Sequence, residues 1–155
     1  MIQLAKRAAD IGIVVADLDA QRRFYGEVLG LPYAGRLPVG PGEVHIYLLG
    51  DSLLKLYRYP SGSIKPRQMT LADFGTHGGL AYITLTLRDL ASAFATLEER
   101  GAVVLAQPSV FLAESDLGPP VGRIHARFAL VADGDGNMIE LFEYVNTDRT
   151  AVAPG

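Results

Sequence analysis

Four polar side chains stand at corresponding points of an internal repeat and are the first candidates for chemistry. Asp10 and Tyr82 begin two similar segments, and Lys55 and Glu140 begin a second similar pair. An internal repeat indicates a duplicated structural unit. Two such units related by a pseudo-twofold axis would bring the four positions to one shared site. A carboxylate, an ammonium group and a phenol in one concave site are what proton transfer beside a carbonyl group requires.

Each of the four residues has a distinct expected role. Lys55, flanked by carboxylates, is expected to stay protonated and to stabilise an enolate or oxyanion. Glu140 or Asp10 would act as the general base, and Tyr82 as the proton donor. The alternative is a buried ion-pair network with Tyr82 hydrogen-bonded to it, since a buried ion pair by itself proves little. In that case the cleft would bind a ligand without transforming it.

The two segments that begin with Asp10 and Tyr82 read DIGIVVADL and YITLTLRDL, so their apolar residues alternate in the same register. Such alternation is typical of a strand, and Asp17 then suits a helix N-cap. The first helix is expected to run to about Leu29, with Tyr25, Val28 and Leu29 facing inward, and to end at Gly30. Three strands are expected next, near residues 31–37, 43–50 and 53–59.

The second half repeats that order. A strand over 80–87 leads to a helix that Asp89 caps and Gly101 ends, with Leu90, Ala93, Phe94 and Leu97 facing inward. Residues 133–137 (DGDGN) are a strong hairpin signal. The remaining strands are expected near 102–107, 123–131 and 137–145. The predicted fold is therefore α+β, built from two βαβββ modules. The expected parts are a first module over 1–59, a connecting loop over 60–79, a second module over 80–145 and a tail over 146–155.

Two long loops, residues 60–79 and 107–122, contain most of the interior prolines and are either functional lids or ordinary surface connections. Because side chains alternate between the two faces of a strand, aromatic and hydroxyl side chains are expected on the same face as the candidate catalytic residues. Such a cup would suit a planar or aromatic small molecule. The expected binding residues are Tyr57, Tyr59, Thr84 and Phe142. The alternative is that these aromatics fill the core, which we favour for Phe142.

Basic residues alternate along one later strand, where Arg123, His125 and Arg127 share a face. If that face lined the cleft the ligand would be anionic, but a solvated outer face is the more common arrangement. His45 has the same ambiguity. His77 lies in a glycine-rich loop, where it is either a lid residue or simply exposed.

Composition excludes several classes of function. The chain has 155 residues, of which 49% are hydrophobic, 14 are basic and 17 are acidic, and it has no cysteine. Disulfides, thiolate nucleophiles and cysteine-ligated metals are thereby excluded. The charges are scattered, so no nucleic-acid partner is expected, and no apolar run is long enough to span a membrane. We expect a cytoplasmic protein.

Several motifs point to one family. They are residues 10–18 (DIGIVVADL), 24–25 (FY), 28–31 (VLGL) and 133–141 (DGDGNMIEL). Together they resemble the vicinal-oxygen-chelate superfamily over roughly residues 8–145. That group includes glyoxalase I, bleomycin-resistance proteins, fosfomycin-resistance enzymes, methylmalonyl-CoA epimerases and extradiol dioxygenases. The resemblance implies a cupped mixed sheet around one cleft, helices packed outside and a homodimer. It leaves the reaction open, because this fold hosts many chemistries.

Metal-dependent members of that superfamily take ligands from four strand positions, usually His, Glu or Gln, His and Glu. The matching positions here are Asp10, Lys55, Tyr82 and Glu140, and only Glu140 keeps the usual residue. Protonated lysine has no lone pair to offer, and a neutral phenol is a poor ligand. We therefore expect no metal and no other cofactor.

The resemblance then favours a metal-independent lyase or isomerase acting on a small carbonyl or phenolic compound. The alternative is a non-catalytic protein that sequesters an antibiotic-like molecule. A metal-dependent dioxygenase or glyoxalase would require a site rebuilt from other residues.

Overall fold

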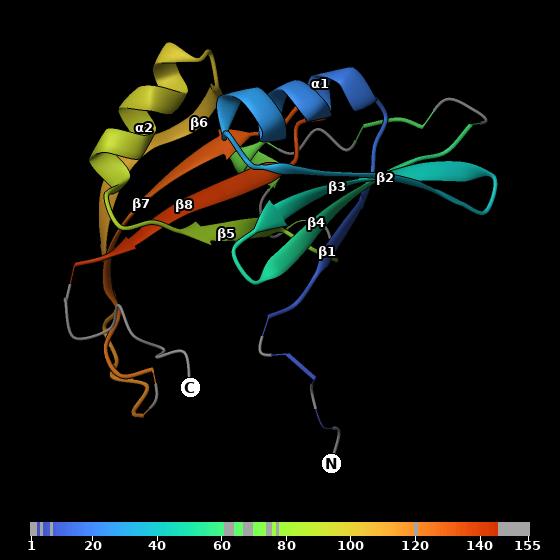
Figure 1. Ribbon diagram of the computed structural model, residues 1–155. Coiled ribbons are helices and arrows are strands. Elements are labelled where there is room, and N and C mark those ends of the chain that lie inside the picture. Colours follow the sequence, from blue (N-terminus) through green and yellow to red (C-terminus); the bar gives the residue numbers. More distant parts are fainter. Residues whose placement is uncertain are drawn as a thin grey trace. The chain divides into compact units, whose positions relative to one another are not determined.

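The computed structural model describes residues 3, 5–6, 8–60, 64–66, 70–73, 76, 78–119 and 121–145. The chain divides into two compact units, one of residues 1–68 with 133–136 and one of residues 69–132 with 137–155. Along the chain, each unit has a strand, a helix and then three further strands, and its four strands form one mixed sheet (Figure 1). The predicted α+β fold of two βαβββ modules is confirmed.

The first unit has the strand order β1-β4-β3-β2. β1 runs parallel to β4, and the other neighbours are antiparallel. The elements are β1 (Ile11–Val14), α1 (Leu18–Arg22), the π-helix η1 (Arg23–Val28), β2 (Tyr33–Val39), β3 (Gly42–Leu49) and β4 (Ser52–Arg58).

The first helix differs from the prediction. The α-helical hydrogen bonding stops at Arg22, and the chain continues as the π-helix η1, in which the Leu29 N–H donates to the Phe24 carbonyl at 2.8 Å. The wider turn leaves Tyr25 buried as predicted and also buries Phe24. Apolar periodicity does not reveal a single extra residue per turn, so the π-helix could not be predicted from the sequence. The predicted Asp17 cap is confirmed by its bond to the Ala20 N–H.

The second unit repeats the topology with the strand order β5-β8-β7-β6. Asp89 caps α2 by accepting from the Ser92 N–H at 3.0 Å, and Leu90, Phe94 and Leu97 are buried, as predicted. The elements are the short 3₁₀ helix η2 (Leu71–Asp73), β5 (Tyr82–Thr86), α2 (Leu90–Glu99), β6 (Val103–Leu112), β7 (His125–Ala132) and β8 (Met138–Tyr144).

Strand β6 is longer than predicted. We expected it to end near residue 107, but Ser109–Leu112 continues the ladder opposite His125–Phe128. The proline at position 108 falls where the register shifts between Ala106 and Ser109. A β-bulge tolerates a residue that has no N–H to donate, so proline does not end the strand here.

Each sheet has one face covered by the helix of its own unit. In the first unit α1 packs against β4, where Leu54 and Leu56 are buried. Gly26 of η1 approaches the Tyr47 ring on the same face. In the second unit the Glu143 carboxylate accepts from the Leu90 N–H of α2. We call the opposite face of each sheet its open face.

The DGDGN hairpin turn is confirmed, and its residues 133–136 form part of the first unit. The Asp135 carboxylate accepts from the N–H groups of Ala16 and Asp17 at 2.8 and 2.9 Å. Asp133 accepts from the Tyr25 hydroxyl at 2.9 Å. Both carboxylates are buried. The turn therefore fixes the corner between β1 and α1, a role that the turn propensity alone did not predict.

Candidate functional site

The open face of the first sheet carries a charged cluster centred on Asp10. The Asp10 carboxylate accepts from the ammonium groups of Lys6 and Lys55, the latter at 2.9 Å, and from the Leu53 N–H at 3.0 Å. Parallel pairing of β1 with β4 is what places position 10 beside position 55, since Ile11 pairs with Leu54 and Gly12 with Lys55. The cluster of Lys6, Asp10 and Lys55 carries a net charge of one positive unit.

The surroundings of Asp10 favour its ionised form. Its bond to Lys6, followed by those to Lys55 and to the Leu53 N–H, holds the pKa of the Asp10 carboxyl well below its usual range. A carboxylate with such a low pKa is a weak proton acceptor at neutral pH. This disfavours Asp10 as the general base and favours a role in orienting Lys55.

Aromatic side chains continue the open face beyond Lys55. The Tyr57 hydroxyl donates to the Val39 carbonyl at 2.9 Å, which fixes the ring. The Tyr59 ring lies 5.8 Å from it, centroid to centroid, at an interplanar angle of 56°. On the other side of Lys55, a Cβ added to Gly12 would meet no atom within 4 Å. The surface beside the ammonium group is therefore open.

The second sheet has a smaller polar pair on its open face. The Thr84 hydroxyl donates to Glu140 Oε2 at 2.6 Å, and the two residues are register partners in β5 and β8. The Phe142 ring packs edge-on against Tyr144, with centroids 5.0 Å apart, and is half-buried. Tyr82 begins β5 and is exposed.

The structure thus brings the predicted residues together in two groups. Asp10 and Lys55 are in contact in the first unit, and Thr84 and Glu140 are in contact in the second. The repeat predicted that Lys55 and Glu140 occupy equivalent positions, and the strand register agrees. Lys55 pairs with Gly12 of the first strand in its sheet, and Glu140 pairs with Thr84 of the first strand in the other sheet. That all four candidate catalytic residues share one site stays a prediction.

The basic residues of β7 lie away from Glu140. Arg127 pairs in register with Glu143, whose carboxylate meets α2, whereas Leu130 pairs with Glu140. Arg127 is exposed, which agrees with the solvated outer face that we favoured. His45 is buried on the helix face of its sheet, where its Nδ1 lies 3.1 Å from the Tyr33 hydroxyl. His77 lies outside the described residues.

The first unit does not fit the superfamily's metal site. Asp10 is engaged by two ammonium groups, and Lys55 presents only N–H donors where a ligand would offer a lone pair. Within the described part of the chain, no three side chains of His, Cys, Asp or Glu are grouped so as to hold a metal ion. The donor chemistry of these residues therefore gives no basis for a metal-dependent step.

Sequence reasoning missed two features of the first unit. One is Lys6, whose ammonium group reaches both Asp10 and, at 3.3 Å, the Asp51 carbonyl. Only its spacing of four residues from Asp10 hinted at this contact. The other is a pocket lined by Arg36, Glu43 and Arg58, which lie on three different strands. Nothing in the linear sequence links them.

Comparison with known families agrees with this architecture. The model of the Glyoxalase/Bleomycin resistance protein/Dioxygenase superfamily matches residues 7–141. The chain belongs to this superfamily. It is 27% identical over 140 residues to the uncharacterized protein YwbC of Bacillus subtilis strain 168, covering 90% of this chain and 99% of that protein.

Several solved structures share the fold at low sequence identity. TnmS3, an antibiotic binding protein from Streptomyces sp. CB03234, superposes with a TM-score of 0.61 at 21% identity, covering 92% of this chain and 99% of that one. A glyoxalase/bleomycin resistance protein/dioxygenase from Alicyclobacillus acidocaldarius gives a TM-score of 0.62 at 17% identity, with 97% and 100% covered. Across the described ranges, no helix has the length and apolar character needed to cross a membrane.

Proposed function

We propose that the protein binds a small molecule with a planar ring and a carbonyl or phenolic oxygen on the open face of the first sheet. The observation that carries this proposal is the placement of the Lys55 ammonium group. Asp10 holds it at 2.9 Å, beside an open position at Gly12 and next to the fixed ring of Tyr57.

The apolar part of the ligand would contact exposed side chains of the same face. Val14 pairs in register with Tyr57 and is 57% exposed, and Leu48, two residues from Ile46 on β3, is 44% exposed. Ile46 itself pairs with Lys55. A patch of exposed apolar residues around a polar group is typical of a binding surface.

The polar part of the ligand would be recognised by Lys55. An ammonium group has three N–H donors, and Asp10 accepts from one of them. The others are suited to a carbonyl or phenolate oxygen, for which a charge-assisted hydrogen bond is stronger than a neutral one. Because Asp10 and Leu53 are also bonded, the orientation of Lys55 is fixed before the ligand arrives.

Superfamily membership is in keeping with such a role. TnmS3, which shares the fold, is an antibiotic binding protein. Sequestration of an antibiotic-like aromatic molecule without turnover is the form of the function that the geometry supports best, because both carboxylate oxygens of Asp10 already accept hydrogen bonds from ammonium groups.

The test is the affinity of 4-hydroxyacetophenone, an uncharged phenolic ketone, measured by calorimetry. Gly12→Leu fills the open position without meeting protein atoms at its Cβ, so it should abolish binding while the protein stays folded. Lys55→Met should weaken binding by about tenfold, and the exposed Lys65→Met is the matched control. Equal affinity in wild type, Gly12→Leu and Lys55→Met would refute the proposal.

A second candidate function is proton transfer by a metal-independent lyase or isomerase. It is favoured by the Thr84 hydroxyl, which orients the Glu140 carboxylate by a 2.6 Å bond and leaves its other oxygen available to act as the base. In this function Lys55 would stabilise the developing oxyanion and Tyr82 would donate the proton. A new product detected by mass spectrometry, lost in Glu140→Gln, would support it. Ligand recovered unchanged supports binding alone.

The remaining expectations rest on the resemblance to the superfamily. We propose a homodimer, which light scattering after gel filtration would show as twice the chain mass. A cytoplasmic location and the absence of a cofactor also stay predictions.

A further inference from the structure

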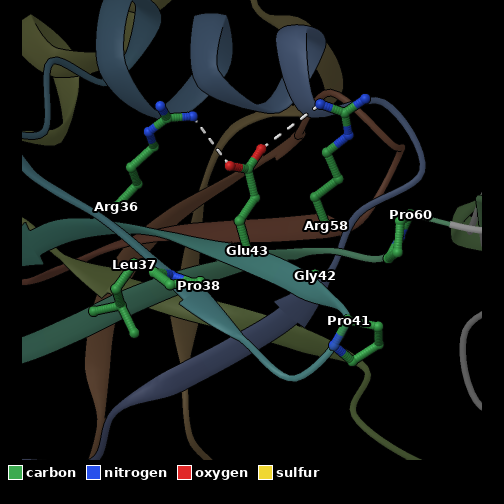
Figure 2. A pocket seen from close by; sticks show the side chains of 8 residues that line it. All are labelled: Arg36, Leu37, Pro38, Pro41, Gly42, Glu43, Arg58 and Pro60. Carbon is green, nitrogen blue, oxygen red and sulfur yellow. Dashed lines mark hydrogen bonds and ion pairs between the residues drawn. The ribbon is translucent and has the colours of Figure 1, made fainter.

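A separate pocket of about 550 Å³ lies at the end of the first sheet near the β2–β3 turn. The side chains of Arg36, Glu43 and Arg58 project to one side of the sheet, and Leu37 projects to the other (Figure 2). Glu43 and Arg58 are register partners, so by alternation they lie on the face opposite Lys55. The pocket is lined by Arg36, Leu37, Pro38, Pro41, Gly42, Glu43, Arg58 and Pro60.

The charged centre of this pocket is one carboxylate between two guanidinium groups. Arg36 Nη1 lies 3.2 Å from Glu43 Oε2, and Arg58 Nη1 lies 3.6 Å from Glu43 Oε1 (Figure 2). A guanidinium group has five N–H donors, so most of the donors of both arginines remain available. With two arginines and one glutamate, the centre has one excess positive charge.

The Glu43 carboxylate lies beside the buried side chain of His45. His45 Nε2 lies 3.4 Å from Glu43 Oε1, and the other ring nitrogen of His45 meets the Tyr33 hydroxyl. Among the groups that hold the pKa of Glu43 below its usual value, His45 is the strongest, ahead of Arg36 and Arg58. The carboxylate is therefore ionised at neutral pH.

The backbone around the pocket is also constrained. A Cβ at Gly42 would lie 2.2 Å from the Arg58 carbonyl oxygen, so only glycine allows the start of β3 to approach the end of β4 this closely. Pro38, Pro41 and Pro60 restrict the chain on either side. The spacing of the two arginines is therefore set by the sheet, although their side chains are 69% and 60% exposed.

We propose that this pocket binds the oxyanion group of a small molecule, a carboxylate or a phosphate, between Arg36 and Arg58, and that Glu43 competes for the same donors. The Glu43 carboxylate shows that a two-oxygen acid fits between the guanidinium groups. The volume exceeds that of a lone ion and lies in the range of small-molecule sites, so the rest of the ligand has room. This site is independent of the binding surface around Lys55.

The test compares inorganic phosphate with acetate by NMR titration of backbone amides, followed for Arg36, Glu43 and Arg58. Arg36→Gln and Arg58→Gln should each weaken binding by about fivefold or more, because each removes a charge-assisted bond. Glu43→Gln should strengthen binding several-fold, because it removes the competing carboxylate. Arg123→Gln, an exposed arginine of the second unit, is the matched control and should leave the affinity unchanged.

The opposite signs expected for the arginine and glutamate variants separate the proposal from general surface electrostatics. Preferential binding of phosphate or of acetate would identify the type of oxyanion. No saturable shift at these amides with either anion would overturn the proposal, as would a Glu43→Gln variant that binds more weakly than wild type. Exposed ion pairs contribute little to stability, so the variants should stay folded, and far-UV circular dichroism checks this.

Discussion

The two bonds of Asp135 to the corner between β1 and α1 predict a large loss of stability on its removal. The carboxylate is 6% exposed and accepts from two backbone N–H groups, those of Ala16 and Asp17. A hydrogen bond to a charged group contributes about 1.5–3 kcal/mol when its loss leaves a buried donor unpaired. Because the two donors are only partly buried, we expect Asp135→Ala to cost roughly 2–4 kcal/mol, and Asp135→Asn, which keeps one acceptor oxygen, about half of that.

Urea unfolding measures this loss of stability. It can be followed by circular dichroism and by tyrosine fluorescence, because the chain has no tryptophan. For a protein of this length the loss corresponds to a fall in Tm of roughly 5–15 °C. Asp19→Asn is the matched control, because Asp19 lies exposed in the first turn of the same helix. A free energy of unfolding of Asp135→Ala within 0.5 kcal/mol of that control, which is about the experimental error, would contradict this prediction.

Two further predictions concern the same unit. Gly134→Ala should be at least as destabilising as Asp135→Ala in urea unfolding, because its Cβ would lie 2.4 Å from the Ala20 carbonyl carbon, and Gly78→Ala, which meets no atom within 4 Å, is the control. The lowered pKa of Asp10 adds stability that is fully present above about pH 4 and is lost as the pH falls further, because the unfolded carboxyl then binds a proton first. Asp10→Asn should therefore show a flatter dependence of stability on pH between about 4 and 2, and a profile parallel to that of wild type would contradict the assignment.

The order of elements in each module could be predicted because the sequence contains an internal repeat. The repeat around Asp10 and Tyr82, with an aspartate cap after each strand, led to the succession of one strand, one helix and three strands in each module, and to the equivalence of Lys55 and Glu140. These features depend on local alternation and capping, which a single sequence displays directly.

The features that escaped prediction all depend on contacts between distant segments. Pro108 suggested the end of a strand, but a bulge opposite β7 absorbs it. Asp133 and Asp135 looked like turn residues only, because their partners lie more than a hundred residues earlier. Arg36, Glu43 and Arg58 meet only because three strands pair in one register.

The repeat indicated that Asp10 and Lys55 lie together, but it did not indicate the electrostatics around them. The contact between Asp10 and Lys55 followed from the repeat, whereas the second ammonium group, that of Lys6, did not. That second contact changes the chemistry, since it makes Asp10 an anchor for Lys55 and a weak proton acceptor. It is also why binding is proposed ahead of catalysis.

The most direct test of the proposed binding surface is a map of amide shift changes when 4-hydroxyacetophenone is added to the labelled protein. We predict that the largest saturable changes fall on Gly12, Lys55 and Tyr57 and that they vanish in Gly12→Leu. Changes confined to other parts of the chain, or unchanged in Gly12→Leu, would contradict the assignment of the open face of the first sheet as the ligand site.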